Sequence, residues 1–126
     1  MNLTEFSKEI HAGNAARGFY DVPRTFPHLA MLVVSELSEA VEADRNGKRC
    51  APERLARVQK SHDMAAQQLF KVAFEADVKD TMEDEIADTV IRILDLCGYL
   101  GIDLDGHVRA KLAYNATREA KHGKAY

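Results

Sequence analysis

The chain has 126 residues, a formal net charge of −3 and two cysteines. This length fits a single domain over residues 1–126, and the negative net charge argues against stable nucleic-acid binding. Cys50 and Cys97 lack C-x-x-C spacing, so neither a disulfide framework nor a zinc site is indicated. The chain has no apolar run long enough to span a membrane and no signal-peptide pattern in its first ten residues, so we expect a soluble cytoplasmic protein without a membrane partner.

The chain is predicted to be helical throughout, because no segment shows the two-residue period of a strand. Glycines, prolines and capping residues place the expected helices at about residues 2–16, 27–45, from 53 onward, 81–100 and 105–121. Asn2 or Thr4 is expected to cap the first helix, and Asp103 or Asp105 the last. The stretch from residue 53 is either one long helix or a broken one, because residues 60–66 show no apolar face. We therefore expect an all-α fold, a four- to five-helix bundle.

Two acidic pairs lie inside the most apolar of these helices. Glu36 and Glu39 are three residues apart in the second helix, where Glu36 shares a face with apolar side chains. Glu85 and Asp88 have the same spacing in the fourth helix, which is apolar nearly all round from residue 86 to residue 100. A pair of this kind is usually a solvated face, but two pairs in apolar helices make that interpretation the weaker one.

Carboxylates withdrawn from water must be neutralised, paired or bound to metal. No Lys or Arg lies between Pro27 and Asp44 to pair with the first set, and Arg92 alone cannot balance the second. Carboxylate oxygens suit hard cations, so we predict that the two pairs bind Mg²⁺, with Mn²⁺ as an alternative. Arg92 and Asp95 continue the acidic stripe and are expected to make a salt bridge that orients the metal ligands, or Arg92 contacts substrate. The opposite face is a predicted hydrophobic seam of Ile86, Val90, Ile93, Cys97 and Leu100.

The last predicted helix carries a basic stripe. Lys111, Asn115, Arg118 and His122 recur at i, i+4, i+7 and i+11, and Lys124 follows in the tail. Taken alone, the stripe is an ordinary solvent face, but next to a metal site it forms the usual clamp for nucleotide phosphates.

These segments together resemble the MazG-like all-α nucleoside triphosphate pyrophosphohydrolases. The resemblance is carried by S-E-L-S-E-A-V-E-A-D-R (35–45), E-D-E-I-A-D-T-V-I-R-I-L-D-L (83–96), K-L-A-Y-N-A-T-R (111–118) and H-G-K (122–124). The family's usual E-E-x-x-E opening reads Ser35-Glu36-Leu37-Ser38-Glu39 here. One acidic position is therefore absent, or Glu42 takes its place, which leaves the number of metal ions open.

The resemblance implies hydrolysis of a nucleoside triphosphate between its α and β phosphates, giving the monophosphate and pyrophosphate. Glu36, Glu39, Glu85 and Asp88 would bind the metal, and Glu39 is our candidate for the general base. The expected substrate-binding residues are Lys111, Asn115, Arg118 and Lys124. The resemblance also implies that a homodimer or homotetramer completes the bundle, while base and sugar preference and biological role stay open.

Three alternatives remain. A phosphoribosyl-ATP pyrophosphohydrolase would share the chemistry and differ in substrate. In a non-catalytic helical interaction module, the acids would make salt bridges between helices or subunits and bind no metal. A di-iron bundle is the weakest alternative, because it needs Glu-x-x-His on two helices and the chain has only Glu119 with His122.

Overall fold

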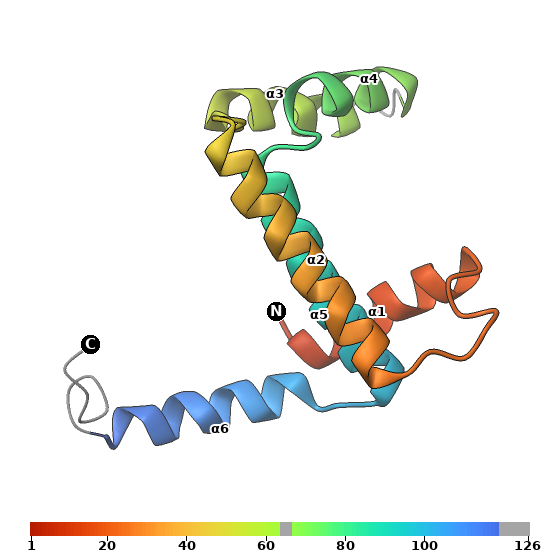
Figure 1. Ribbon diagram of the computed structural model, residues 1–126, viewed down its shortest axis with the longest axis vertical. Helices are drawn as coiled ribbons and strands as arrows, with labels where there is room; N and C mark the ends of the chain where they lie inside the picture. The colour runs from red at the N-terminus through yellow and green to blue at the C-terminus, as the bar shows by residue number, and fades with distance from the viewer. Residues whose placement is uncertain (64–66, 119–126) are drawn as a thin grey trace. The chain divides into compact units, whose positions relative to one another are not determined.

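A computed structural model describes residues 1–63 and 67–118, and within these residues the chain forms six α-helices and no strand (Figure 1). The helices are α1 (Leu3–Ala16), α2 (Phe26–Arg45), α3 (Pro52–Asp63), α4 (Gln67–Asp77), α5 (Met82–Leu100) and α6 (Leu104–Ala116). The all-α prediction is confirmed. None of the described helices is both long and apolar enough to cross a membrane.

The chain divides into two compact units. Unit 1 comprises Met1–Arg24 and Ile93–Tyr126, and unit 2 comprises Thr25–Arg92. Helix α5 therefore contributes its first part to unit 2 and its last part to unit 1.

In unit 1, α1 packs closely against the last part of α5. Ser7 of α1 is almost fully buried, and its hydroxyl donates to the Leu3 carbonyl. Gly98 of α5 faces it, and a Cβ atom added there would collide with the Ser7 carbonyl oxygen and lie 2.7 Å from His11 Cβ. The absence of a side chain at Gly98 is therefore what allows the two helices to approach this closely.

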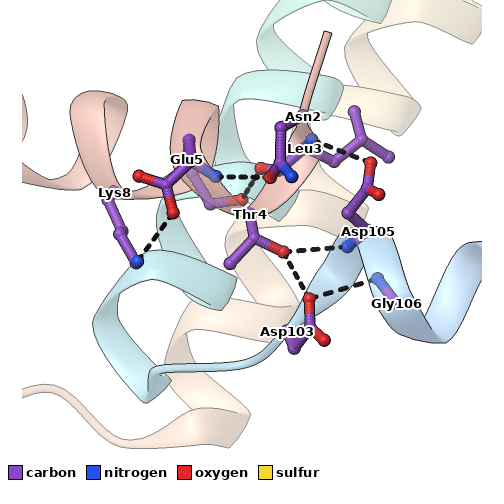
Figure 2. A network of polar contacts seen from close by, with 9 residues as sticks. Asn2, Leu3, Thr4, Glu5, Lys8, Asp103, Asp105 and Gly106 are labelled. Atoms are coloured by element: carbon purple, nitrogen blue, oxygen red, sulfur yellow. Dashed lines mark hydrogen bonds and ion pairs between the residues drawn. The ribbon is translucent and has the colours of Figure 1, made fainter.

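A polar network joins the beginning of α1 to the beginning of α6 (Figure 2). The Thr4 hydroxyl donates to Asp103 Oδ1 at 2.7 Å and accepts the Asp105 N–H at 3.0 Å. The Leu3 N–H donates to Asp105 Oδ1, and Asp103 Oδ1 also accepts the Gly106 N–H as the cap of α6. Since Asn2 Oδ1 caps α1, the sequence signals at both helix starts are confirmed.

A second polar group of unit 1 centres on Asp95 of α5. Its carboxylate is buried and accepts from Asn14 Nδ2 at 2.9 Å, and His11 Nδ1 lies 3.0 Å from its other oxygen. Tyr20 and Tyr99 stack beside His11, and burial, followed by the neighbouring Asp95 carboxylate, raises the pKa of Tyr20. Asp95 therefore bonds to α1 and makes no salt bridge with Arg92 in the part of the chain that the structure describes.

In unit 2, α2 runs alongside the first part of α5, and α3 lies beside α4 (Figure 1). Pro27 occupies the first turn of α2, as predicted, and Gly47 follows its end with a φ of 65°. The cap of α2 is Thr25, which the sequence analysis did not name. The uncertain stretch from residue 53 proves to be two helices, α3 and α4. Val58 of α3 and Val78 after α4 are buried.

The predicted hydrophobic seam of α5 is mostly exposed. Only Cys97 is buried, whereas the other four positions are each at least 38% exposed, namely Ile86, Val90, Ile93 and Leu100. The seam prediction is wrong for a single chain, because periodicity shows which residues share a face but not whether another helix covers it.

Helix α6 is shorter than predicted. It ends at Ala116, because the Thr117 N–H and the Thr117 hydroxyl both bond to the Tyr114 carbonyl and close the last turn. The predicted continuation to about Lys121 is wrong at residues 117 and 118, and the residues beyond lie outside the described part of the chain.

Candidate metal centre

Three of the four predicted metal ligands meet in unit 2. Glu36 and Glu39 of α2 and Glu85 of α5 each offer a carboxylate oxygen, and the three oxygens lie within 4.8 Å of one another. The i, i+3 spacing places the two α2 carboxylates on one side of their helix, and Glu85 in the first turn of α5 reaches the same point. Carboxylates from two separate helices therefore converge, as the sequence predicted.

The three carboxylates differ in burial. The side chain of Glu36 is 13% exposed, and it shares its helix with the buried Leu29 and Ala40, as the helical wheel indicated. Glu85 is 7% exposed, and its carboxylate has no hydrogen-bond or ion-pair partner among the described residues. Glu39 is exposed, and its one polar contact in the described chain is a long one, 3.5 Å from the Ser35 hydroxyl.

Among the residues that the structure describes, a single cation is paired directly with this group. Arg92 Nε of α5 donates to Glu36 Oε1 of α2 at 2.9 Å, which links the two helices. The sequence suggested an interhelical salt bridge for Arg92 and Asp95 that orients the metal ligands. Arg92 makes one directly to the predicted ligand Glu36, whereas Asp95 bonds to α1. One arginine against three carboxylates leaves an excess of negative charge.

Asp88, the fourth predicted ligand, lies outside the group of three. It is half-buried on α5 and lines the same cleft as the three glutamates, a space of about 990 Å³. Burial, followed by the charges of Asp84 and Glu36, raises the pKa of Asp88, and Arg92 opposes this shift.

The electrostatics of the group favour neutralisation of its negative charge. Burial raises the pKa of Glu85, and the negative charges of Glu39, Asp84 and Asp88 raise it further. A carboxyl group that is buried among other carboxylates without a partner is stabilised either by a proton or by a cation. Because all the donors are carboxylate oxygens, the residues present fit a hard divalent cation such as Mg²⁺ or Mn²⁺.

Two further aspartates belong to the same region and were missed by the sequence analysis. Asp80, in the turn before α5, and Asp84, in its first turn, form a second group with Glu85, again with carboxylate oxygens within 4.8 Å of one another. The available signal was the run of acids at i, i+4 and i+5 that ends in Glu85. Asp80 lies outside the apolar helix, so a pattern of acidic pairs within that helix does not include it.

The cleft also holds side chains that the sequence analysis did not select. Lys71 and Lys79 bring positive charge to its lining, and Phe70 and Phe74 bring aromatic surface, with ring centroids 6.0 Å apart. These residues come from α4 and the turn after it, a region whose sequence shows no motif.

The predicted substrate-binding residues belong to unit 1, whereas the carboxylates belong to unit 2. Lys111 and Arg118 flank the ring of Tyr114, at 5.0 and 5.7 Å from its centroid. Asn115 Oδ1 is buried and has no hydrogen-bond partner in the described chain. Lys124 lies outside the described residues, as do Glu119 and His122.

Comparison of the chain with protein-family models, curated proteins and solved structures found no match. The candidate site therefore has to be interpreted from its own residues.

Proposed function

We propose that the protein is a metal-dependent nucleoside triphosphate pyrophosphohydrolase that cleaves the bond between the α and β phosphates. The observation that carries the proposal is the convergence of Glu36, Glu39 and Glu85 within 4.8 Å at a large open cleft. The resemblance to MazG-like enzymes named above supplies the reaction, and the geometry supplies the metal ligands.

In this proposal Glu36, Glu39 and Glu85 hold Mg²⁺ or Mn²⁺, and Asp88 at the same cleft completes the ligand set. When bound, the cation neutralises phosphate oxygens and acidifies a water molecule. Arg92 holds one oxygen of Glu36, which fixes that carboxylate in place and leaves its other oxygen for the metal.

Glu39 is the proposed general base. It is the most exposed of the three carboxylates and has no ion pair among the described residues, so it can reach a water molecule in the cleft. Glu36 is held by Arg92 and Glu85 is buried, so neither is as free to take up a proton and release it to solvent.

The cleft is large enough for a nucleotide, since ligand pockets usually measure roughly 300–1,000 Å³. Lys71 and Lys79 at its lining can contact phosphate oxygens, and Phe70 and Phe74 offer surface for a base. Lys111, Asn115, Arg118 and Lys124 are the further phosphate-binding residues that the resemblance implies.

We propose in addition that the protein acts as a homodimer or homotetramer. Helix α2 exposes an apolar stripe in which each side chain is about half exposed or more, formed by Met31, Val34, Leu37 and Val41. Together with the exposed seam of α5, this amount of apolar surface is typical of a chain that associates with other copies. Sedimentation equilibrium of the purified chain would show whether it does.

Product analysis tests the reaction. The purified chain is incubated with Mg²⁺ and a panel of canonical and modified nucleoside triphosphates and phosphoribosyl-ATP, and the phosphate products are separated. The proposal requires a monophosphate and pyrophosphate from a nucleoside triphosphate. A diphosphate with orthophosphate would mean that another bond is cleaved, and hydrolysis of phosphoribosyl-ATP alone would identify the rival enzyme.

A thermal measurement separates an enzyme from an interaction module. Mg²⁺ or Mn²⁺ raises the melting temperature of a protein whose folded state binds it, and the effect depends on cation concentration. The same titration of a variant carrying Glu36→Gln and Glu39→Gln serves as the control. If cations stabilise neither protein, the carboxylates are structural and the metal-dependent proposal is wrong.

A further inference from the structure

The strongest feature not used above is the group of Asp80, Asp84 and Glu85. It joins the turn before α5 to the first turn of that helix, and its three carboxylate oxygens lie within 4.8 Å of one another. Only Glu85 is shared with the group of Glu36 and Glu39, so its carboxylate belongs to both groups.

Glu85 is the observation that points to a ligand here. The residue is 93% buried, since 7% of its surface is exposed, and no hydrogen-bond donor or cation among the described residues contacts its carboxylate. A buried carboxylate without a partner lowers the stability of the folded protein unless a proton or a cation neutralises it. A carboxylate has two oxygens, and one cation on each side would satisfy both.

The distances between the carboxylate oxygens of Asp80, Asp84 and Glu85 suit the binding of one ion by all three residues. Two oxygens bound to one ion can be separated by at most twice the metal–oxygen distance, which is roughly 4.2 Å for Mg²⁺ and about 5 Å for Ca²⁺. The oxygens of Asp80, Asp84 and Glu85 fall within 4.8 Å, so small side-chain movements bring all three onto one ion.

The contacts that Asp80 and Asp84 already make would compete only weakly with a bound cation. Both oxygens of Asp80 lie within 3.0 Å of Lys79 Nζ, but this pair is between adjacent residues and both side chains are more than half exposed. Asp84 accepts the Asp80 N–H with Oδ2, and its Oδ1 has no partner in the described chain. Arg92, the cation of the neighbouring group, pairs with Glu36.

We propose that Asp80, Asp84 and Glu85 bind a second divalent cation, which shares Glu85 with the cation held by Glu36 and Glu39. Mg²⁺, Mn²⁺ and Ca²⁺ are the candidates, because the donors are all carboxylate oxygens. The proposed second site depends only on Asp80, Asp84 and Glu85. The sharing of Glu85 between two ions rests on the metal site of the proposed function.

The test counts Mn²⁺ ions bound by the full chain. Equilibrium dialysis gives the number of ions per chain, and electron paramagnetic resonance detects the magnetic coupling between two Mn²⁺ ions bridged by one carboxylate. The variants are Asp84→Asn and Asp80→Asn for the new site and Glu36→Gln for the neighbouring one. Asp63→Asn is the matched control, because it makes the same charge change at a side chain that is 81% exposed on α3.

The wild-type chain and the Asp63→Asn control are expected to bind two Mn²⁺ ions that couple magnetically. Asp84→Asn and Asp80→Asn should each bind one ion and lose the coupling. Asparagine retains an oxygen for the Asp80 N–H and tolerates the left-handed backbone of residue 80, where φ is 61°, so both variants should fold, as circular dichroism will show.

Two outcomes would overturn the inference. One is a single ion in the wild-type chain that both aspartate variants still bind, and the other is two ions in the wild-type chain and in both aspartate variants. If Glu36→Gln binds as many ions as the wild-type chain while the aspartate variants each lose one, the second site stands and the metal site of the proposed function fails. The two proposals are therefore tested separately.

Discussion

Arg92 Nε and Glu36 Oε1 lie 2.9 Å apart and join α5 to α2 at the edge of the carboxylate group. This ion pair is partly shielded from water, since the two side chains are 32% and 13% exposed. Arg92 therefore offsets part of the repulsion between carboxylates in the metal-free protein and also holds a proposed metal ligand in position.

Replacing Arg92 by Met should destabilise the metal-free protein by about 1–2 kcal/mol, because Glu36 is left without a partner in a poorly solvated position. Mg²⁺ should then raise the melting temperature more than in the wild type, since the cation takes over the neutralisation of Glu36. Calorimetry with and without Mg²⁺ measures both effects. Arg45→Met is the control, because the pair of Arg45 and Glu42 is long, at 3.9 Å, and exposed. Equal stability of the Arg92 variant and the control would contradict this account.

Glu39→Gln should lower turnover by roughly 100-fold or more, the usual contribution of a general base. Binding of a non-hydrolysable α,β-methylene nucleotide, measured by calorimetry, should be largely retained. Glu42→Gln is the matched control one turn further along α2, where Glu42 bonds to Asn46 and lies outside the carboxylate groups. If turnover survives in Glu39→Gln, the base is another residue.

The stability of the metal-free protein should fall as the pH rises above the ordinary carboxyl range. Burial raises the pKa of Glu85, Asp84 and Asp88, so the folded chain binds protons more tightly than the unfolded chain does. Unfolding then becomes more favourable as the pH passes from the ordinary values through the raised ones. Urea unfolding over a pH series in the presence of a chelator measures this slope.

Glu85→Gln removes the buried charge and should weaken this pH dependence. The metal-free variant is expected to be more stable than the wild type near neutral pH by roughly 1–2 kcal/mol, while losing the stabilisation by Mg²⁺. If the variant is less stable than the wild type at neutral pH, the buried charge of Glu85 does not destabilise the metal-free protein. If the variant still responds fully to Mg²⁺, Glu85 is not a metal ligand.

Gly98→Ala should destabilise the protein by about 2–3 kcal/mol, because the new methyl group would overlap the Ser7 carbonyl and crowd His11. Gly13→Ala is the matched control in α1, where the nearest atom to an added Cβ is Arg17 Nη1 at 3.9 Å. That change should stabilise the protein by roughly 0.5–1 kcal/mol, since alanine is the better helix former. Urea unfolding of both variants measures the difference, and a neutral Gly98→Ala would mean that α1 and α5 are not tightly packed.

Local signals predicted much of the secondary structure. Caps, prolines and glycines act on a few neighbouring residues, so Asn2, Pro27, and Gly101 with its φ of 66° marked helix ends correctly. The convergence of Glu36, Glu39 and Glu85 was also predictable, because a carboxylate in an apolar helix requires a partner and each helix had only a few candidates.

Other contacts between distant segments were not predictable. Thr4 and Asp103 are 99 residues apart and carry no shared pattern. Asp80 lies in the turn before α5 with a left-handed backbone, and the run of acids that ends in Glu85 does not by itself show that the three carboxylates meet. Asp88 lies one helical turn beyond Glu85 and stays outside both carboxylate groups. Spacing along a helix fixes the face on which a side chain lies, and the neighbouring helix decides which side chains on that face actually meet.

The division of α5 between the two units has a practical consequence for dissecting this protein. Domain boundaries usually fall in exposed linkers, but here the boundary at residues 92 and 93 falls within a continuous helix. Unit 1 is also assembled from both ends of the polypeptide, with unit 2 inserted between them. A fragment comprising either unit alone would begin or end in the middle of α5, so truncation would disrupt the unit that it is meant to isolate. Point substitutions in the whole 126-residue chain are therefore the better tool.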